Sequence, residues 1–328
     1  MIGAFLVLMC AAAAPPALPP HAVAALQEAE RLRAAKEWDK ALDAYARVLA
    51  AAPGDAGLRV LLAGDFLRSG APELKGPAYA LLREATEIDA DHFAANRVLA
   101  DWYCARDFFR DAADRYRRAL RGKPNDPDTL HNLAVALVKL RQFEEALRVA
   151  EESVRWSGGG ARFRVGVAMV YADWRKHDKA LDVLASIDPA ALDGAARTLF
   201  YQTRGEARFL AGDAKNAIDD FTTLTRLEPK HAKGFQLLGL HLQRLDRFAE
   251  AETAFRRAVV LDPANEAAHF GLGTVCLRLG RNEEGVAALA RARELAEKRT
   301  QARLRDLREM SAELKERQKR GWTPERGR

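Results

Sequence analysis

The residues that could carry acid–base, nucleophilic or metal chemistry are few and widely spaced. The seven histidines are His21, His92, His131, His177, His231, His241 and His269. Protein zinc sites need ligands at short, fixed spacings such as HExxH or CxxC, and the sequence contains neither. No Asp or Glu stands at ligand spacing beside a histidine either. The sequence therefore predicts no metal and no cofactor, and the histidines are interpreted as surface or inter-helix residues.

The sequence also lacks the pattern of a phosphate-binding loop. The run Gly158-Gly159-Gly160 has no following Lys-Ser/Thr, which a P-loop requires to hold phosphate and magnesium. No Ser/His/Asp order suggests a catalytic triad. We therefore expect a chain that is not an enzyme.

Composition places the chain among soluble folded proteins. It has 328 residues, of which 48% are hydrophobic and 30% charged. The net charge is +6, and residues 299–328 hold ten basic and five acidic residues, so 10 − 5 = +5 lies in this tail. The remainder is nearly neutral, which gives no electrostatic reason to expect nucleic acid binding. The tail predicts a solvated cap, with weak contact to anionic surfaces as the alternative.

Residues 1–21 are typical of a targeting leader. Ile2 to Ala14 is an uncharged apolar run that is too short for a membrane span of roughly 20 residues. Its length suits the apolar region of a signal peptide, and Ala11-Ala12-Ala13 supplies the small residues of a cleavage site. We expect an exported protein, periplasmic or secreted. The alternatives are a cytoplasmic chain with an apolar leader and, as a minor case, lipidation of Cys10.

An internal repeat dominates the rest of the chain. Small residues recur at spacings of 34 or 37: Ala29, Ala63, Ala100, Ala134, Ala168, Gly205, Gly239 and Gly273. A second small series follows, mostly twelve residues later: Ala41, Ala78, Ala112, Ala146, Ala180, Ala217, Ala251 and Gly285. A bulky residue stands four places further on in most units. A period of this length predicts stacked helix–turn–helix units.

Residues 232–265 carry the fullest version of the pattern: Phe235, Leu238-Gly239, Leu242, Ala251, Phe255, Ala258 and Pro263. This pattern resembles the tetratricopeptide repeat family. The resemblance covers about five sixths of the chain, in eight units: 22–55, 56–92, 93–126, 127–160, 161–197, 198–231, 232–265 and 266–298. It implies an all-α, right-handed solenoid of about eight repeats with a C-terminal capping helix.

The physical reason for the small residues is close helix packing. Two helices approach to the lower end of the usual ~8–10 Å separation only where the residues at their crossing are small. Residues 299–320 are free of Gly and Pro and predict a separate closing helix, with an apolar stripe at Leu304, Leu307, Met310 and Leu314. The extra residues of the two 37-residue units, near 69–77 and after Pro189, predict surface loops. Cys104 and Cys276 lie five repeats apart, too far for a disulfide, and are interpreted as buried small residues.

After the repeats, leader and tail are assigned, no segment remains for a catalytic domain. The resemblance implies a protein or peptide partner bound on the concave face, which the first helix of each repeat lines. The candidate binding residues are Arg97, Asp101, Asp128, His131, Asn132, Gln202, Glu206, Lys233, Gln236 and Gln243. The Lys/Asn/Arg clamp of chaperone-binding repeats is absent. We expect a scaffold or adaptor; the alternative is a subunit that recruits substrates to a separate catalytic chain.

The apolar content of that face distinguishes two modes of binding. Exposed Phe209, Leu240 and Phe270 would favour an obligate protein partner, whereas a polar face would favour a transient peptide ligand.

Overall fold

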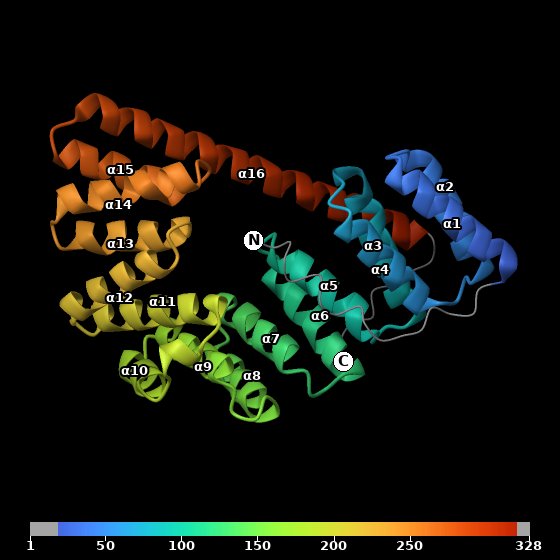
Figure 1. Cartoon of the computed structure of the whole chain (residues 1–328), viewed down its shortest axis with the longest axis horizontal. Helices are drawn as coiled ribbons and strands as arrows, with labels where there is room; N and C mark the ends of the chain where they lie inside the picture. The colour runs from blue at the N-terminus through green and yellow to red at the C-terminus, as the bar shows by residue number, and fades with distance from the viewer. Residues whose placement is uncertain (1–18, 320–328) are drawn as a thin grey trace. The chain divides into compact units, whose positions relative to one another are not determined.

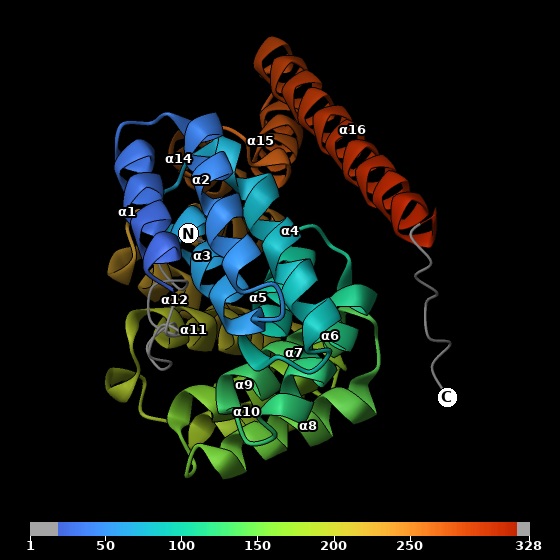
Figure 2. The ribbon, with the colours of Figure 1, turned by 90° about the vertical axis from the view of Figure 1, so that its right-hand side faces the viewer.

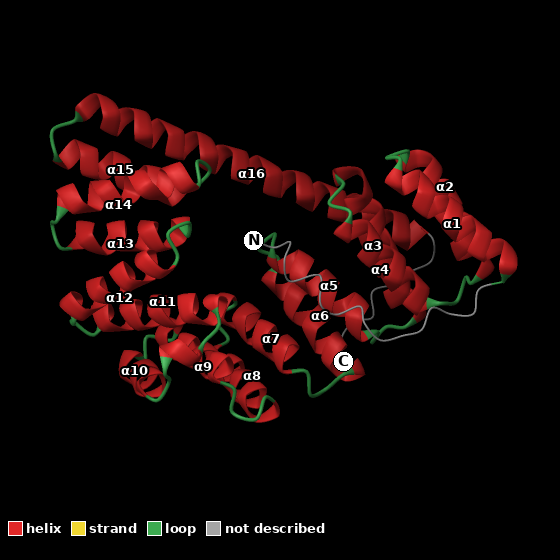
Figure 3. Ribbon diagram, in the orientation of Figure 1, coloured by secondary structure: helices red, strands yellow, loops and turns green. Residues whose placement is uncertain are grey.

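The computed structural model describes residues 19–319, with side chains up to residue 308, and this part of the chain is helical without any strand (Figures 1 and 3). The helices are α1 (Pro20–Ala34), α2 (Trp38–Ala51), α3 (Ala56–Arg68), α4 (Pro72–Ile88), α5 (Phe93–Cys104), α6 (Phe109–Gly122), α7 (Pro127–Lys139), α8 (Phe143–Trp156), α9 (Ala161–Asp173), α10 (His177–Ala185), α11 (Gly194–Leu210), α12 (Ala214–Leu227), α13 (Ala232–Arg244), α14 (Phe248–Leu261), α15 (Glu266–Arg278) and α16 (Asn282–Lys319). Residues 1–18 of the leader predicted over 1–21 lie outside the described residues, and so do residues 320–328 of the basic tail.

The helices pack in consecutive pairs, such as α5 with α6 and α13 with α14. The prediction of an all-α fold of paired helices is confirmed. The chain divides into two compact units, Met1–Val170 and Tyr171–Arg328, which are described separately below as unit 1 and unit 2. The division falls within α9.

The two series of small residues occupy the helix crossings, as predicted. All sixteen are buried, including Gly273 and Gly285 of the eighth repeat. In α13 a Cβ on Gly239 would lie 2.9 Å from the ring of Phe255 in α14, closer than carbon atoms can pack. The absence of a side chain at Gly239 is therefore what admits the Phe255 ring.

Each helix pair reverses through one residue in the left-handed region. These residues are Lys36, Gly70, Asp107, Arg141, Arg175, Gly212, Asp246 and Gly280, with φ between 56° and 91°. Every one stands at the fifteenth position of its repeat, counted from the unit boundaries above. Five of the eight are not glycine, although this conformation costs an L-residue roughly 1–2 kcal/mol.

The first insertion is mostly helical, which corrects the predicted loop over 69–77. Helix α4 begins at Pro72 and continues through Pro77. Pro72 is tolerated at the start of the helix because the amide hydrogen that it lacks would have no partner there. Only Ser69, Gly70 and Ala71 remain outside the helices.

The second insertion is also more ordered than a simple loop. Pro189–Ala191 form one 3₁₀ turn, and α11 starts four residues before the predicted unit boundary at 198. The Arg197 side chain holds this segment by donating to the carbonyls of Pro189 (3.0 Å) and Leu192 (2.7 Å).

Helix α16 joins two elements that we predicted as separate. It runs without a break from the second helix of the last repeat through the predicted closing helix. No Gly or Pro occurs between residues 286 and 320, so nothing in the sequence ends the helix near residue 298. Ion pairs one turn apart, such as Lys298 with Glu294 (2.6 Å), add to its stability.

A buried histidine lies in the core of unit 2. His241 of α13 is 3% exposed, stacks on Phe221 at 4.5 Å between ring centroids, and contacts Phe209 at 4.4 Å. Its Nδ1 has no hydrogen-bond partner. Burial, assisted by nearby Arg244, lowers the pKa of His241 to about 4.

The left-handed turn position predicts the effect of glycine substitutions. Lys36→Gly should raise the free energy of unfolding by up to about 1 kcal/mol, because it removes the left-handed penalty but adds the flexibility of glycine to the unfolded chain. Gly212→Ala should lower it by about 1 kcal/mol. Urea denaturation measures both. Gly54→Ala is the matched control, because Gly54 is also unobstructed but does not have a positive φ; equal effects at Gly54 and Gly212 would contradict the explanation.

The pKa of His241 predicts that unit 2 loses stability in acid. The unfolded histidine takes up a proton near pH 6.5, whereas the folded one does so only at about 4. Stability is therefore complete above pH 6.5 and falls as the pH drops toward 4, with a loss of about 2 kcal/mol near pH 5. Urea midpoints of the parent and of His241→Phe at neutral pH and near pH 5 measure this difference. The phenylalanine variant should lose less stability, and parallel losses would exclude His241 as the cause.

Candidate functional site

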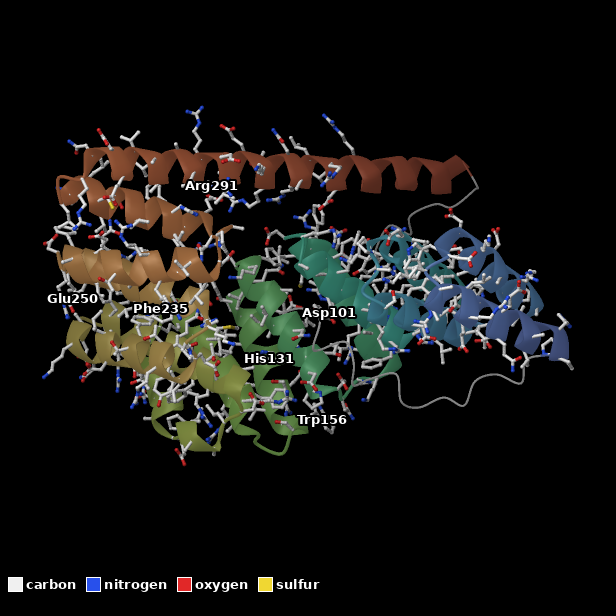
Figure 4. All side chains as sticks on the ribbon, turned by 45° about the horizontal axis from the view of Figure 1, so that its top comes forward. Asp101, His131, Trp156, Phe235, Glu250 and Arg291 are labelled. Atoms are coloured by element: carbon white, nitrogen blue, oxygen red, sulfur yellow. The ribbon has the colours of Figure 1, made fainter. Side chains whose placement is uncertain are left out.

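The first helices of three successive repeats form one polar face in unit 1. Contacts between neighbouring repeats show that α5, α7 and α9 lie side by side. Asn132 of α7 donates to Asp101 of α5 (3.4 Å), and Asp128 of α7 pairs with Arg162 of α9 (2.7 Å). Figure 4 shows Asp101 and His131 on neighbouring helices. We call Arg97, Asp101, Asp128, His131, Asn132 and Arg162 the polar face of unit 1.

Asp101 is the most constrained member of this face. Its carboxylate accepts a short hydrogen bond from the hydroxyl of Tyr116 in α6 (2.5 Å) in addition to the bond from Asn132. Burial raises the pKa of Asp101, while these two hydrogen bonds and the positive charge of Arg97 oppose the rise. Burial likewise raises the pKa of Cys104 to about 11. Cys104 is half-buried rather than fully buried as predicted, and it is a protonated thiol at neutral pH.

His131 depends on a glycine in the next repeat. A Cβ on Gly166 of α9 would lie 2.6 Å from Nδ1 of His131. The ring also makes an edge contact with Phe163, with centroids 6.1 Å apart. Burial lowers the pKa of His131, against the opposing charge of Asp128. The imidazole is therefore neutral near pH 7 and can both donate and accept a hydrogen bond.

The candidate residues of unit 2 make two bonds within single helices and one bond between repeats. Gln202 donates to Glu206 (3.5 Å) on α11, and Lys233 donates to Gln236 (3.1 Å) on α13. Gln243 donates across to Thr274 of α15 (3.0 Å). Gln236 is only 8% exposed, so little of it is available to a ligand.

The three apolar residues predicted on the concave face, all in unit 2, differ in exposure. Phe209 and Leu240 are half-buried, and Phe209 packs on His241. Phe270 of α15 is 59% exposed. The apolar surface on this face is therefore concentrated at the last repeat.

A buried charge cluster in unit 2 was not predicted. Asp220 of α12 is 3% exposed and binds Arg204 (2.6 Å) and Arg208 (2.7 Å) of α11. The only sequence signal is the spacing of the two arginines, one helical turn apart. Since both arginines neutralise one carboxylate inside a helix pair, the cluster ties α11 to α12.

One group within the described residues brings three potential metal ligands together. Oxygens of Glu252 and Glu284 and the sulfur of Cys276 lie within 4.8 Å of one another. Arg256 pairs with both carboxylates, and Arg281 pairs with Glu252. The guanidinium groups already supply the positive charge, so we assign this cluster to repeat packing.

Over residues 19–319, no helix combines the length and the apolar content that crossing a bilayer would need.

Models of the tetratricopeptide repeat match residues 237–300 and 116–148. The small glutamine-rich tetratricopeptide repeat-containing protein 2 of Mycosarcoma maydis is 32% identical over 74 residues, which cover 23% of this chain and 21% of that protein. The chain thus spans about a fifth of the length of this relative.

Solved structures share the fold at low sequence identity. A tetratricopeptide repeat protein from Parabacteroides merdae aligns with 78% of this chain and 99% of its own, at 14% identity and a TM-score of 0.65. Yeast Tom70 aligns with 96% of this chain and 70% of its own, at 15% identity and a TM-score of 0.58. Repeat models, a repeat-containing relative and paired-helix structures agree with the period found in the sequence. The chain is a tetratricopeptide repeat protein.

Proposed function

We propose that this chain is a non-catalytic scaffold that binds an extended peptide segment on the polar face of unit 1. Tetratricopeptide repeat proteins mediate protein binding and are typically non-catalytic. The observation that carries the proposal is the set of contacts between α5, α7 and α9, which orient Asp101, Asn132 and Asp128 before any ligand arrives. Preorganisation lowers the entropy lost on binding.

The chemistry of the face suits a peptide backbone better than a charged terminus. Arg97 and Arg162 balance Asp101 and Asp128, so the face carries no net charge. The amide of Asn132 and the neutral imidazole of His131 can each donate and accept hydrogen bonds. A peptide backbone presents the same mixture of donors and acceptors. The ligand is therefore an extended segment of mixed polarity, not an acidic tail.

Selection of peptides on the parent protein tests this assignment. Peptides chosen from a random displayed library should bind the variant Asn132→Ala/Arg162→Ala at least tenfold more weakly, because the variant lacks two side chains of the polar face. A tenfold weaker affinity corresponds to a loss of about 1.4 kcal/mol of binding free energy. The matched control is Gln202→Ala/Gln243→Ala, which removes two polar side chains of unit 2. Equal losses in both variants, or none in either, would place binding elsewhere.

We also propose that the leader is cleaved on export. The apolar run before Pro15 and the alanines at 11–13 support this. The intact mass of the protein purified from its native host should correspond to an N-terminus near Ala14. A mass that includes Met1 would contradict cleavage and favour the cytoplasmic alternative.

A further inference from the structure

One side of α16 carries an uncovered row of residues at coiled-coil spacing. The row consists of Val286, Ala290, Arg293, Glu297, Thr300, Leu304 and Leu307, with alternating steps of four and three. All seven are exposed; Val286, Leu304 and Leu307 are 61%, 48% and 44% exposed. Steps of four and three keep residues on one side of a helix. Figures 1 and 2 show that α16 continues well past the end of α15. The buried residues of α16, Gly285 and Ala292, do not belong to the row.

The earlier repeats show what kind of element covers this side. Val286 is the twenty-first residue of its unit, and the corresponding residues are Ile218 in α12 and Glu252 in α14. Those two are only 7% and 5% exposed. Ile218 shares a core with Leu242 of α13, and Glu252 lies beside Cys276 of α15. In each case the first helix of the next repeat covers the position, and the four-residue connection between the two helices makes them antiparallel neighbours. Within residues 19–319 no helix follows α16.

The row is complementary to itself when read in reverse. Two antiparallel copies that cross at residue 295 place Val286 opposite Leu304, because 286 and 304 are each nine residues from that centre. Ala290 then faces Thr300, and Arg293 faces Glu297, once on each side of the two-fold axis. Apolar pairs thus lie at both ends, and two opposite-charge pairs lie at the middle.

The charges along the helix favour the same direction. Residues 283–294, on one side of the centre at 295, hold two arginines and three glutamates, or 2 − 3 = −1. Residues 296–307, on the other side, hold four basic and two acidic residues, or 4 − 2 = +2. An antiparallel pair places the acidic half of one helix against the basic half of the other, whereas a parallel pair would oppose like charges.

We propose that α16 is a dimerisation helix, and that the α16 of a second copy packs on the row in antiparallel orientation, as the first helix of the next repeat packs on α12 and α14. The paired positions of the row extend from Val286 to Leu304, about 27 Å of helix. The charged residues Arg293 and Glu297 at the centre of the row select a second helix over a lipid surface, because an interfacial helix needs an unbroken apolar face. In the single chain these two residues pair with each other at 3.1 Å, and both are largely exposed, so they are free to exchange partners.

Charge reversal tests whether a second copy of α16 binds the row and whether the two helices pair about residue 295. The full chain should be a dimer in light scattering at concentrations up to about 100 µM. Arg293→Glu and Glu297→Arg should each become monomeric, because each opposes like charges at both central sites. An equimolar mixture of these two variants should regain the dimer, since every facing pair is then opposite in charge. The double variant Arg293→Glu/Glu297→Arg should also dimerise.

The control is Arg305→Glu, which makes the same change of charge about 100° around the helix from Leu304. It should leave the dimer in place, and circular dichroism should show equal helix content in all variants. A parent that is monomeric throughout, whether or not it binds anionic vesicles or an acidic helix, would overturn the proposal. So would single variants that still dimerise, or a mixture that does not.

Discussion

Close approach of two helices at a pair of small residues is the contact on which every repeat of this protein depends. Where Gly239 meets the ring of Phe255, a single added carbon would occupy space that the ring already fills. The same crossing recurs in each helix pair, with alanine in most of them. A short helix pair cannot bury its apolar side alone, so this approach also determines how each pair presents that side to the next one. The polar face, the buried charges and the exposed row of α16 are all placed by this packing.

Polar residues serve two different purposes in the two units. In unit 2, Asp220 is enclosed with Arg204 and Arg208, and a buried carboxylate with both partners in place joins two helices of one repeat. In unit 1, Asp101 is linked through Asn132 to the following repeat. The first arrangement removes charge from solvent, whereas the second keeps donors and acceptors at the surface in a fixed geometry. A fixed polar surface is the more useful one for recognition.

Much of the fold could be predicted from the sequence, because a repeat multiplies a weak local signal. The small residues near 239 and 251 and the bulky Phe255 recur often enough to predict the helix pairs and their contacts. Two features could not be predicted in this way. The continuity of α16 follows from the absence of Gly and Pro between residues 286 and 320, and the repeat period alone does not predict where the last helix ends. The link from Tyr116 to Asp101 depends on the rotation of two helices about their axes, and a spacing rule leaves that rotation open.

The left-handed residue at each chain reversal affects how such a protein can change over generations. Lys36, Asp107 and Gly212 adopt this same conformation with unrelated side chains, so the reversal makes little demand on what precedes or follows it. A whole unit can be duplicated or deleted in a gene without a new turn having to arise. The number of repeats can therefore change while the pairing of helices within each unit is kept.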